Sequence, residues 1–200
     1  MLVILLVLTA ALSAAAADDP AVGSLLVADR DLHDPNFAAT VIVVVSYNEF
    51  GALGLVLNRQ TGIPISRAFR EWQDAAGRSD TVFEGGPVEE NSTLALVRTT
   101  AAPPHGRRVL PGVYVTSDET VLRSQMAAKS GPGQFRVYKG YAGWGPGQLE
   151  REIEAGAWHV LKPRPAAIFD PNPDSLWTRL IHEMEVRLAT LSRLFPLPAA

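Results

Sequence analysis

Three separate stretches of the chain carry residue types that together could recognise a small anion or a peptide terminus. Asn58-Arg59 supplies an amide and a guanidinium, Gly85-Gly86-Pro87 supplies a special backbone turn, and the stretch 140–148 supplies further glycines and two large aromatic rings. Turns of this kind, with an amide, a guanidinium and an indole, can together bind such groups. We therefore predict that these stretches meet in the fold and form one binding site from Asn58, Arg59, Gly85, Gly86, Pro87, Tyr141, Gly143, Trp144, Gly145 and Gln148.

The glycine-rich stretch matches neither of the common phosphate-binding patterns. Its spacing is not G-x-G-x-x-G or G-x-x-x-x-G-K-[ST], and no lysine follows the glycines to hold a phosphate. Glu150, Glu152 and Glu154 make the following helix acidic, which suits the helix dipole more than a bound phosphate. The alternative interpretation is a structural turn in which Tyr141 and Trp144 fill the core.

An enzyme of unknown class is the second functional hypothesis. In it, Arg59 stabilises an anion while Asp118 or Glu84 acts as the base. Other chemistry finds little support, because no serine lies in a G-x-S-x-G pattern, His182-Glu183 does not complete H-E-x-x-H, and the chain has no cysteine. We therefore predict no catalytic residue, metal ligand or cofactor, and we favour a non-enzymatic binding or regulatory module.

A polar segment, residues 29–37, contains three aspartates and one histidine and could in principle hold calcium. An EF-hand loop needs glycine at its sixth position and glutamate at its twelfth. Counted from Asp29, those positions hold Asp34 and Thr40. Turn formation by Asp, Asn and Pro explains the segment better than a metal site does.

The composition fits one globular domain. Of 200 residues, 47% are hydrophobic and 20% are charged, as is usual for globular proteins. The formal net charge of −3 lacks the basic excess of a nucleic-acid-binding surface, and no block of like charge suggests a membrane-binding patch. The expected partner is therefore a small anion or another protein.

Residues 1–17 are apolar or small throughout and are typical of a secretory signal peptide. A leucine-rich core occupies residues 2–8, alanines fill positions 14–17, and Asp18-Asp19-Pro20 ends the segment. The segment has no lysine or arginine, so an uncleaved anchor or a start codon placed too early is the alternative. We predict that the signal peptide is cleaved and that the protein is periplasmic or secreted, with a single domain at 18–200. If the start codon is placed too early, the protein would instead be cytoplasmic.

Strands outnumber helices in the predicted element order. Strands are expected at 23–28, 40–47, 52–58, 81–84, 93–98, 113–116, 135–138, 158–161 and 166–169. The β-branched run at 40–47 predicts burial on both faces, and Gly54 in its hairpin partner predicts a bulge or a close backbone approach. Helices are expected at 64–77, at 119–129, directly after the glycine turn, and from Asp174 to just before Phe195. Ser117 or Asp118 would cap the second of these helices. Residues 99–111 are expected to form a loop.

Because strands and helices do not alternate regularly, the order predicts an α+β fold. Four motifs then occur along the chain in a fixed order: Asp34-Pro35-Asn36-Phe37, Gly51-Ala52-Leu53-Gly54-Leu55-Val56-Leu57-Asn58-Arg59, Gly85-Gly86-Pro87-Val88, and the glycine-rich stretch from Gly140 to Leu149. Together they resemble the YqgE/AlgH family, also called UPF0301 or DUF179.

The resemblance implies a single α+β domain with a small, barrel-like, bifurcated and mostly antiparallel sheet surrounded by helices. It implies no established catalytic residue or cofactor, and one branch of the family is linked by name to transcriptional control of alginate production. Two positions depart from the pattern, since Tyr47 stands where members usually have histidine and Gln60 where they have proline. Any role of that histidine is absent here, and the leader sets the chain apart from cytoplasmic members.

Overall fold

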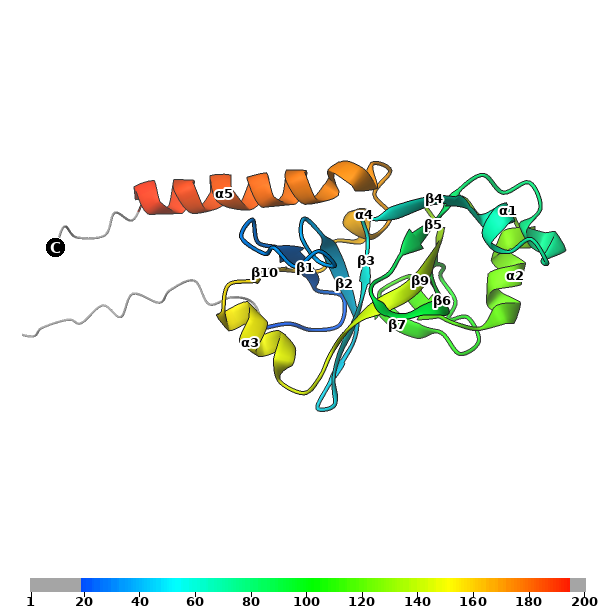
Figure 1. Ribbon diagram of the computed structural model, residues 1–200, viewed down its shortest axis with the longest axis horizontal. Helices are drawn as coiled ribbons and strands as arrows, with labels where there is room; N and C mark the ends of the chain where they lie inside the picture. Colours follow the sequence, from blue (N-terminus) through cyan, green and yellow to red (C-terminus); the bar gives the residue numbers. More distant parts are fainter. Residues whose placement is uncertain (1–18, 195–200) are drawn as a thin grey trace, which may run out of the picture.

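The computed structural model describes residues 19–194, apart from the side chains at 187–189 and 191–194 (Figure 1). The predicted signal peptide at 1–17 lies outside the described residues, so its cleavage and the export of the protein stay predictions. No helix in the described range is long and apolar enough to span a membrane.

One ten-stranded sheet organises the described chain, and it is open and not closed into a barrel. Its order is β10-β1-β2-β3-β9-β6-β8-β7, with β4 and β5 branching from it. The strands are β1 (Leu25–Ala28), β2 (Val41–Asn48), β3 (Gly51–Val56), β4 (Gln60–Pro64), β5 (Thr81–Glu84), β6 (Val88–Arg98), β7 (Arg107–Leu110), β8 (Val113–Thr116), β9 (Phe135–Trp144) and β10 (Trp158–Leu161). The predicted α+β class is confirmed.

The sheet divides at β9, which is the only strand shared by both halves of the sheet in the described chain. Its first part pairs antiparallel with β6, whereas Ala142, Gly143 and Trp144 pair with β3. β5 adds a short parallel pairing at Tyr138 and Lys139. This branching confirms the predicted bifurcation, and Figure 1 shows β9 running between the two halves.

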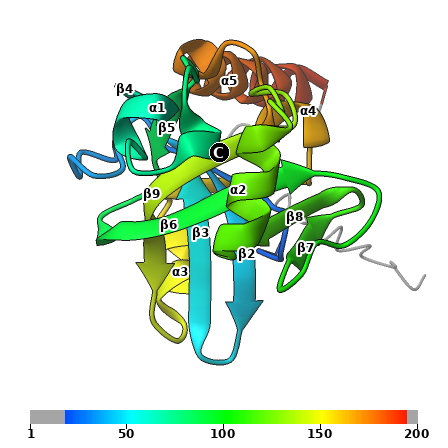
Figure 2. The same cartoon turned by 90° about the vertical axis from the view of Figure 1, so that its right-hand side faces the viewer.

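Five α-helices lie within residues 19–194: α1 (Ile65–Ala68), α2 (Glu119–Ala127), α3 (Gln148–Glu154), α4 (Pro165–Ile168) and α5 (Leu176–Leu194). α5 and α3 lie on opposite sides of β1, β2 and β3 (Figure 1). α2 buries Val121, Leu122 and Met126 against β6 and β9, and Figure 2 shows it lying across that face. These contacts bury apolar side chains of both halves of the sheet, which stabilises them by removing those side chains from water.

Local sequence explains the central hairpin. Val41 to Val45 are all buried, as the β-branched run predicts. The pairing of β2 with β3 shifts register between Val44 and Ser46, opposite Gly54. A Cβ at Gly54 would lie only 2.4 Å from the Ile42 side chain at Cγ2 and 3.2 Å from the Trp144 ring, so the packed side chains leave no space for a larger residue. The predicted bulge is confirmed.

The glycine-rich stretch is mostly strand, which corrects the predicted turn. Gly140 to Trp144 continue β9, and the chain turns only at 145–147 before α3 begins. The glycines are needed because neighbouring backbones press against β9: a Cβ at Gly140 would lie 2.3 Å from the Gly86 carbonyl oxygen. Close approach, and not a turn, therefore explains the first of these glycines.

Three other predicted elements are wrong. The expected helix at 64–77 forms only α1 and a 3-10 turn at Gln73–Ala75, because β4 takes up Pro64 and the chain leaves helical geometry at Phe69. The expected strand at 166–169 is helix α4, which begins with Pro165 in the first turn, where proline is well tolerated. The expected loop at 99–111 contains β7, an edge strand that exposes Arg107 and Arg108 and buries Val109 and Leu110.

Candidate functional site

Asn58 holds the segment that leads into β2. Its Oδ1 accepts a 2.8 Å hydrogen bond from the Val41 N–H, and its Nδ2 donates to the Ala39 carbonyl at 2.9 Å. Ala39 has a φ of 56°, which a residue with a Cβ adopts only under tertiary constraint. Asn58 therefore satisfies backbone groups of its own chain with both halves of its amide.

Arg59 binds the same segment. Its guanidinium donates to the carbonyls of Asn36 at 2.6 Å, Pro35 at 3.1 Å and Ala38 at 3.3 Å. Its Nη1 also lies 3.6 Å from Oε1 of Glu84. Three of the five N–H groups that a guanidinium offers are thus used within the chain. A ligand at Arg59 would share the side chain with these carbonyls.

The loop held by Arg59 connects it to Trp144. Phe37 stacks on Trp144 with ring centroids 6.2 Å apart and meets Trp158 edge-on at 5.7 Å. Trp144 is only 5% exposed. Its indole N–H and that of Trp158 both donate to Oε2 of Glu152, at 2.9 and 2.8 Å. Trp144 is therefore a core residue, as the alternative interpretation of the glycine-rich stretch states.

Gly145 and Gln148 form the turn into α3. The Gly145 N–H donates to Oε1 of Gln148 at 3.1 Å, and Nε2 of Gln148 donates to Oε1 of Glu152 at 2.9 Å. Gly147 has a φ of 67° and occupies the cap position before the helix. The polar groups of this turn are bound to one another and close the corner between β9 and α3.

The Gly85-Gly86-Pro87 turn lies against β9. A Cβ at Gly85 would lie 2.2 Å from the Gly140 carbonyl oxygen, and one at Gly86 would lie 2.3 Å from the carbonyl carbon of Tyr141. Gly86 also has a φ of 147°. The structure therefore brings this turn together with Gly140 and Tyr141, two residues of the third stretch.

The predicted site residues thus fall into three groups. Asn58 and Arg59 hold the loop that precedes β2. The Gly85–Pro87 turn lies against Tyr141 of β9. Trp144, Gly145 and Gln148 form the corner between β9 and α3, and Gly143 is an exposed residue of β9. The three groups are linked through the loop at 35–38 and through β9. Whether any of them binds a ligand stays a prediction.

A large bulge in β6 interrupts its pairing with β9 between Val88 and Thr93. Val88 pairs with Tyr141 and Thr93 with Lys139, so residues 89–92 stand opposite the single residue Gly140 and bulge out of the ladder. Glu89 has a φ of 47°, and its Oε1 accepts a 3.2 Å hydrogen bond from the Tyr141 hydroxyl. Bulges of this kind re-aim side chains and occur often beside functional sites.

A cavity of about 600 Å³, here named the bulge cavity, opens beside residues 89–92. It is lined by Leu53, Phe69, Trp72, Glu89, Ser92, Thr93, Leu94, Ser117, Glu119, Leu122 and Tyr141. Of the predicted site residues, only Tyr141 is among them. The hydroxyl oxygen of Ser92 is buried and has no hydrogen-bond partner among the described residues. The sequence signal for this cavity is the polar run Glu89-Glu90-Asn91-Ser92, which interrupts an otherwise regular strand.

Lys139 lies next to the bulge. Its Nζ donates to Oγ1 of Thr93 at 2.7 Å and lies 5.3 Å from the centre of the Phe69 ring. Burial lowers the pKa of the Lys139 amine. No carboxylate in the described part of the chain lies within 4.0 Å of it. With Glu84, Gly86, Pro87 and others, Lys139 lines a separate hollow of about 370 Å³.

The carboxylates proposed for catalysis have structural partners. Asp118 caps α2, and hydrogen bonds from the Thr120 hydroxyl and the Val121 N–H hold the pKa of the Asp118 carboxyl below its usual value. A low pKa makes it a weak base. Glu84 pairs with Arg59, as noted above. The described residues contain no group of three or more His, Cys, Asp or Glu side chains placed to hold a metal ion.

Comparison with known proteins gives consistent results. Residues 25–189 match the sequence model of the DUF179 family, described as AlgH-like. A UPF0301 protein of Streptomyces avermitilis is 38% identical over 176 residues, covering 85% of this chain and 90% of the relative. A UPF0301 protein of Chlamydia caviae is 31% identical over 170 residues, covering 85% and 89%.

Two solved structures share the fold. The solution structure of the AlgH protein from Pseudomonas aeruginosa has a TM-score of 0.66 at 29% identity and covers 89% of this chain and 94% of its own. A crystal structure from Corynebacterium diphtheriae has a TM-score of 0.70 at 24% identity, covering 83% and 88%. The predicted resemblance is thereby confirmed, and the chain belongs to the UPF0301 family of AlgH-like proteins.

Proposed function

We propose that this protein is a non-enzymatic binding module and that its ligand occupies the bulge cavity. The observation that carries the proposal is the Ser92 hydroxyl, which is buried at the cavity wall without a hydrogen-bond partner among the described residues. Leaving a buried polar group unpaired costs about 1–3 kcal/mol. A ligand that fills the bulge cavity and hydrogen-bonds Ser92 would recover that cost.

The cavity has the size and lining of a small-molecule site. Its volume of about 600 Å³ lies within the range of ligand pockets, which are mostly apolar with a few converging polar groups. Phe69, Trp72 and Tyr141 supply aromatic surface, and Ser92 and Thr93 supply hydroxyls. Such walls suit a ligand with an aromatic or aliphatic body and one hydrogen-bonding edge.

The charges at the rim favour a neutral or cationic ligand. Glu119 is neutralised by Arg123, whose Nε lies 2.7 Å from its carboxylate. Glu89 has the Tyr141 hydroxyl as a partner but no cation within 4.0 Å in the described part of the chain. An amino group on the ligand would complete an ion pair with Glu89, and a second anion there would be repelled.

Glu89 also holds a backbone conformation that costs energy. Its φ of 47° is uncommon for a residue with a Cβ, and such positions cluster at ligand-binding sites. A nucleophile needs a base within hydrogen-bonding reach, and the Ser92 hydroxyl has none among the described residues. Binding without reaction therefore accounts for the site better than catalysis does, and it fits the regulatory role that the family resemblance implies.

Saturation-transfer NMR with a set of small aromatic amines, neutral amides and carboxylates tests this proposal. The amines and amides should bind the wild-type protein, and Leu53→Trp, which fills the cavity, should abolish their binding. Ile63→Trp is the matched control, because Ile63 is 44% exposed and does not line the bulge cavity. If no compound binds, or if those that do bind Leu53→Trp equally well, the proposal is wrong.

A further inference from the structure

A buried arginine lines a second cavity that the proposed function does not use. Arg136 is 3% exposed and borders a cavity of about 330 Å³ between β5, the start of β9 and the segment after α4. Side chains alternate along a strand, so Arg136 projects from the opposite face of β9 to Lys139 and Tyr141. We infer that this cavity, here named the Arg136 cavity, binds the carboxylate of a small and largely apolar monocarboxylic acid.

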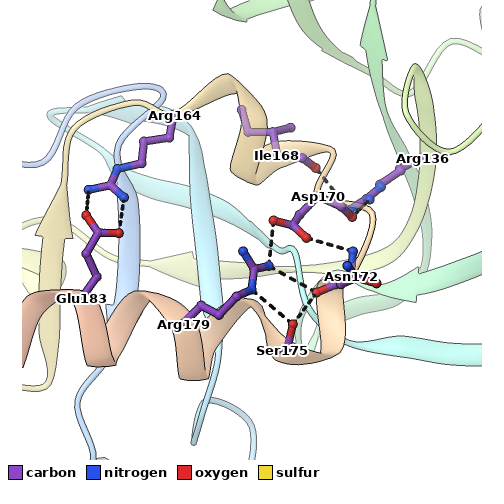
Figure 3. Close-up of polar contacts among 8 residues, drawn as sticks. All are labelled: Arg136, Arg164, Ile168, Asp170, Asn172, Ser175, Arg179 and Glu183. Carbon is purple, nitrogen blue, oxygen red and sulfur yellow. Dashed lines mark hydrogen bonds and ion pairs between the residues drawn. The ribbon is translucent and has the colours of Figure 1, made fainter.

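The guanidinium of Arg136 is held by neutral groups alone. Nε donates to the Pro132 carbonyl at 3.0 Å, Nη1 to the Ile168 carbonyl at 3.3 Å, and Nη2 to the Asp170 carbonyl. Figure 3 shows Arg136 directed at the carbonyls of Ile168 and Asp170. A guanidinium has five N–H donors, so two remain for another acceptor while these three contacts fix its orientation.

Neighbouring carboxylates do not balance its charge. Asp80 pairs with Arg78 at 2.5 Å. Asp170 pairs with Arg179 at 2.8 Å, as Figure 3 shows. No carboxylate oxygen of the described residues lies within 4.0 Å of an Arg136 nitrogen. Buried charges in folded proteins are normally paired, and an unpaired one is costly. The partner that this position lacks is an anion.

Two further features near Arg136 point the same way. Phe169 lies between two cations, with its ring centre 4.7 Å from the Arg98 guanidinium and 5.9 Å from that of Arg136. Tyr138, two residues along the same face of β9, has a buried hydroxyl without a hydrogen-bond partner among the described residues. Burial raises the pKa of Tyr138 to about 12, and the nearby Arg136 charge opposes that rise. The guanidinium groups of Arg98 and Arg136 thus make the surroundings of Phe169 and Tyr138 positive.

The walls of the cavity define the rest of the ligand. They include Phe83, Phe135 and Phe169 together with Pro132, Pro171 and Pro173. The Arg136 guanidinium lies 4.9 Å from the Phe83 ring centre, which helps to fix its plane. Aromatic rings and prolines are rigid and apolar, so they suit an aromatic or branched aliphatic body.

A monocarboxylate matches these features better than a phosphate does. A planar carboxylate can accept two parallel hydrogen bonds from one guanidinium. The site offers one unpaired positive charge, and the Asp80 carboxylate also lines the cavity. A dianion would leave one negative charge uncompensated beside Asp80, which is unfavourable in a partly buried site.

Calorimetric titration of the purified protein with phenylacetate, phenylacetamide and inorganic phosphate tests the inference. Phenylacetate should bind, while the amide and phosphate should bind at least about tenfold more weakly, because one lacks the charge and the other lacks the apolar body. A tripeptide that ends in phenylalanine, compared as its free acid and as its C-terminal amide, tests whether the carboxylate is that of a peptide terminus. Tighter binding of the tripeptide acid than of phenylacetate would overturn the assignment to a small acid.

Variants locate the binding. Arg136→Lys keeps the charge but not the planar fork, so it should weaken phenylacetate binding by about tenfold or more. Ser79→Trp provides a test that does not depend on a buried substitution, because Ser79 is exposed and lines the cavity. It should weaken binding without lowering the melting temperature, whereas Thr100→Trp, at an exposed position away from the cavity, should not. No phenylacetate binding at millimolar concentration, or unchanged binding to Ser79→Trp, would show the inference to be wrong.

Discussion

The hydroxyl of Tyr47 donates a hydrogen bond to the carboxylate of Glu150, which ties the end of β2 to the first turn of α3. The hydrogen bond raises the pKa of the Tyr47 hydroxyl to about 12, and burial and the Glu150 charge act in the same direction. Tyr47 therefore has a structural contact that joins β2 to α3.

Tyr47→Phe should destabilise the fold by about 1 kcal/mol at neutral pH, because it removes one partly exposed, charge-assisted hydrogen bond. The folded pKa of about 12 lies above the unfolded value of 10, so the contribution is complete below pH 10 and is lost as the pH rises towards 12. Urea unfolding between pH 7 and 11 measures this difference. Tyr114→Phe is the control, since Tyr114 makes no side-chain hydrogen bond in the described structure. If the difference in unfolding free energy between wild type and Tyr47→Phe stays constant up to pH 11, the linkage is contradicted.

Glu152→Ala should cost about 2–4 kcal/mol of unfolding free energy. The substitution leaves the indole N–H groups of Trp144 and Trp158 without their shared acceptor, and each unpaired buried donor costs about 1–3 kcal/mol. Glu152→Gln keeps an acceptor and should lose less. Thermal unfolding and tryptophan fluorescence measure the effect, with exposed Glu154→Ala as the control. Equal stability of Glu152→Ala and Glu154→Ala would mean that the indoles do not depend on this carboxylate.

Gly86→Ala should destabilise the protein by about 3 kcal/mol or more, since it adds strain at a φ of 147° to overlap with the Tyr141 backbone. Gly133→Ala is the matched control, because its Cβ would meet nothing within 4 Å and its φ is unexceptional. That substitution should be close to neutral. Chemical denaturation of both variants measures the difference, and similar midpoints would show that the turn can move away from β9.

Glu89→Gly should stabilise the fold by about 0.5–1 kcal/mol and at the same time weaken amine binding in the bulge cavity. Glycine adopts the observed φ of 47° without steric cost, whereas the carboxylate that we propose to meet the ligand is removed. Melting temperature and ligand-observed NMR test the two halves of the prediction. Glu90→Gly, at a neighbouring exposed position without a positive φ, should not gain stability. A loss of stability in Glu89→Gly would mean that the strain it relieves is smaller than the contribution of the hydrogen bond from Tyr141 that it removes.

Local chemistry alone determined much of the fold. The β-branched run at 41–45 can be buried on both faces only as a strand, and Asp118 can cap α2 because its carboxylate reaches the N–H groups of the next turn. The ordered motifs were enough to identify the family. The strand and the helix cap depend on residues that are close together in the sequence. The family assignment depends on the order of the motifs, which can be read directly from the chain.

Contacts between distant segments decided the rest. Residues 107–110 are a strand because β8 pairs with them, and Gly140 lies in a strand because the Gly86 backbone leaves no space for a Cβ. Arg59 seemed available in the sequence, yet its donors meet carbonyls more than 20 positions away, while Arg136, which no motif marks, is held by carbonyls 32 and 34 positions later. The sequence shows which charges exist, but whether each one is paired depends on segments brought together only when the chain folds.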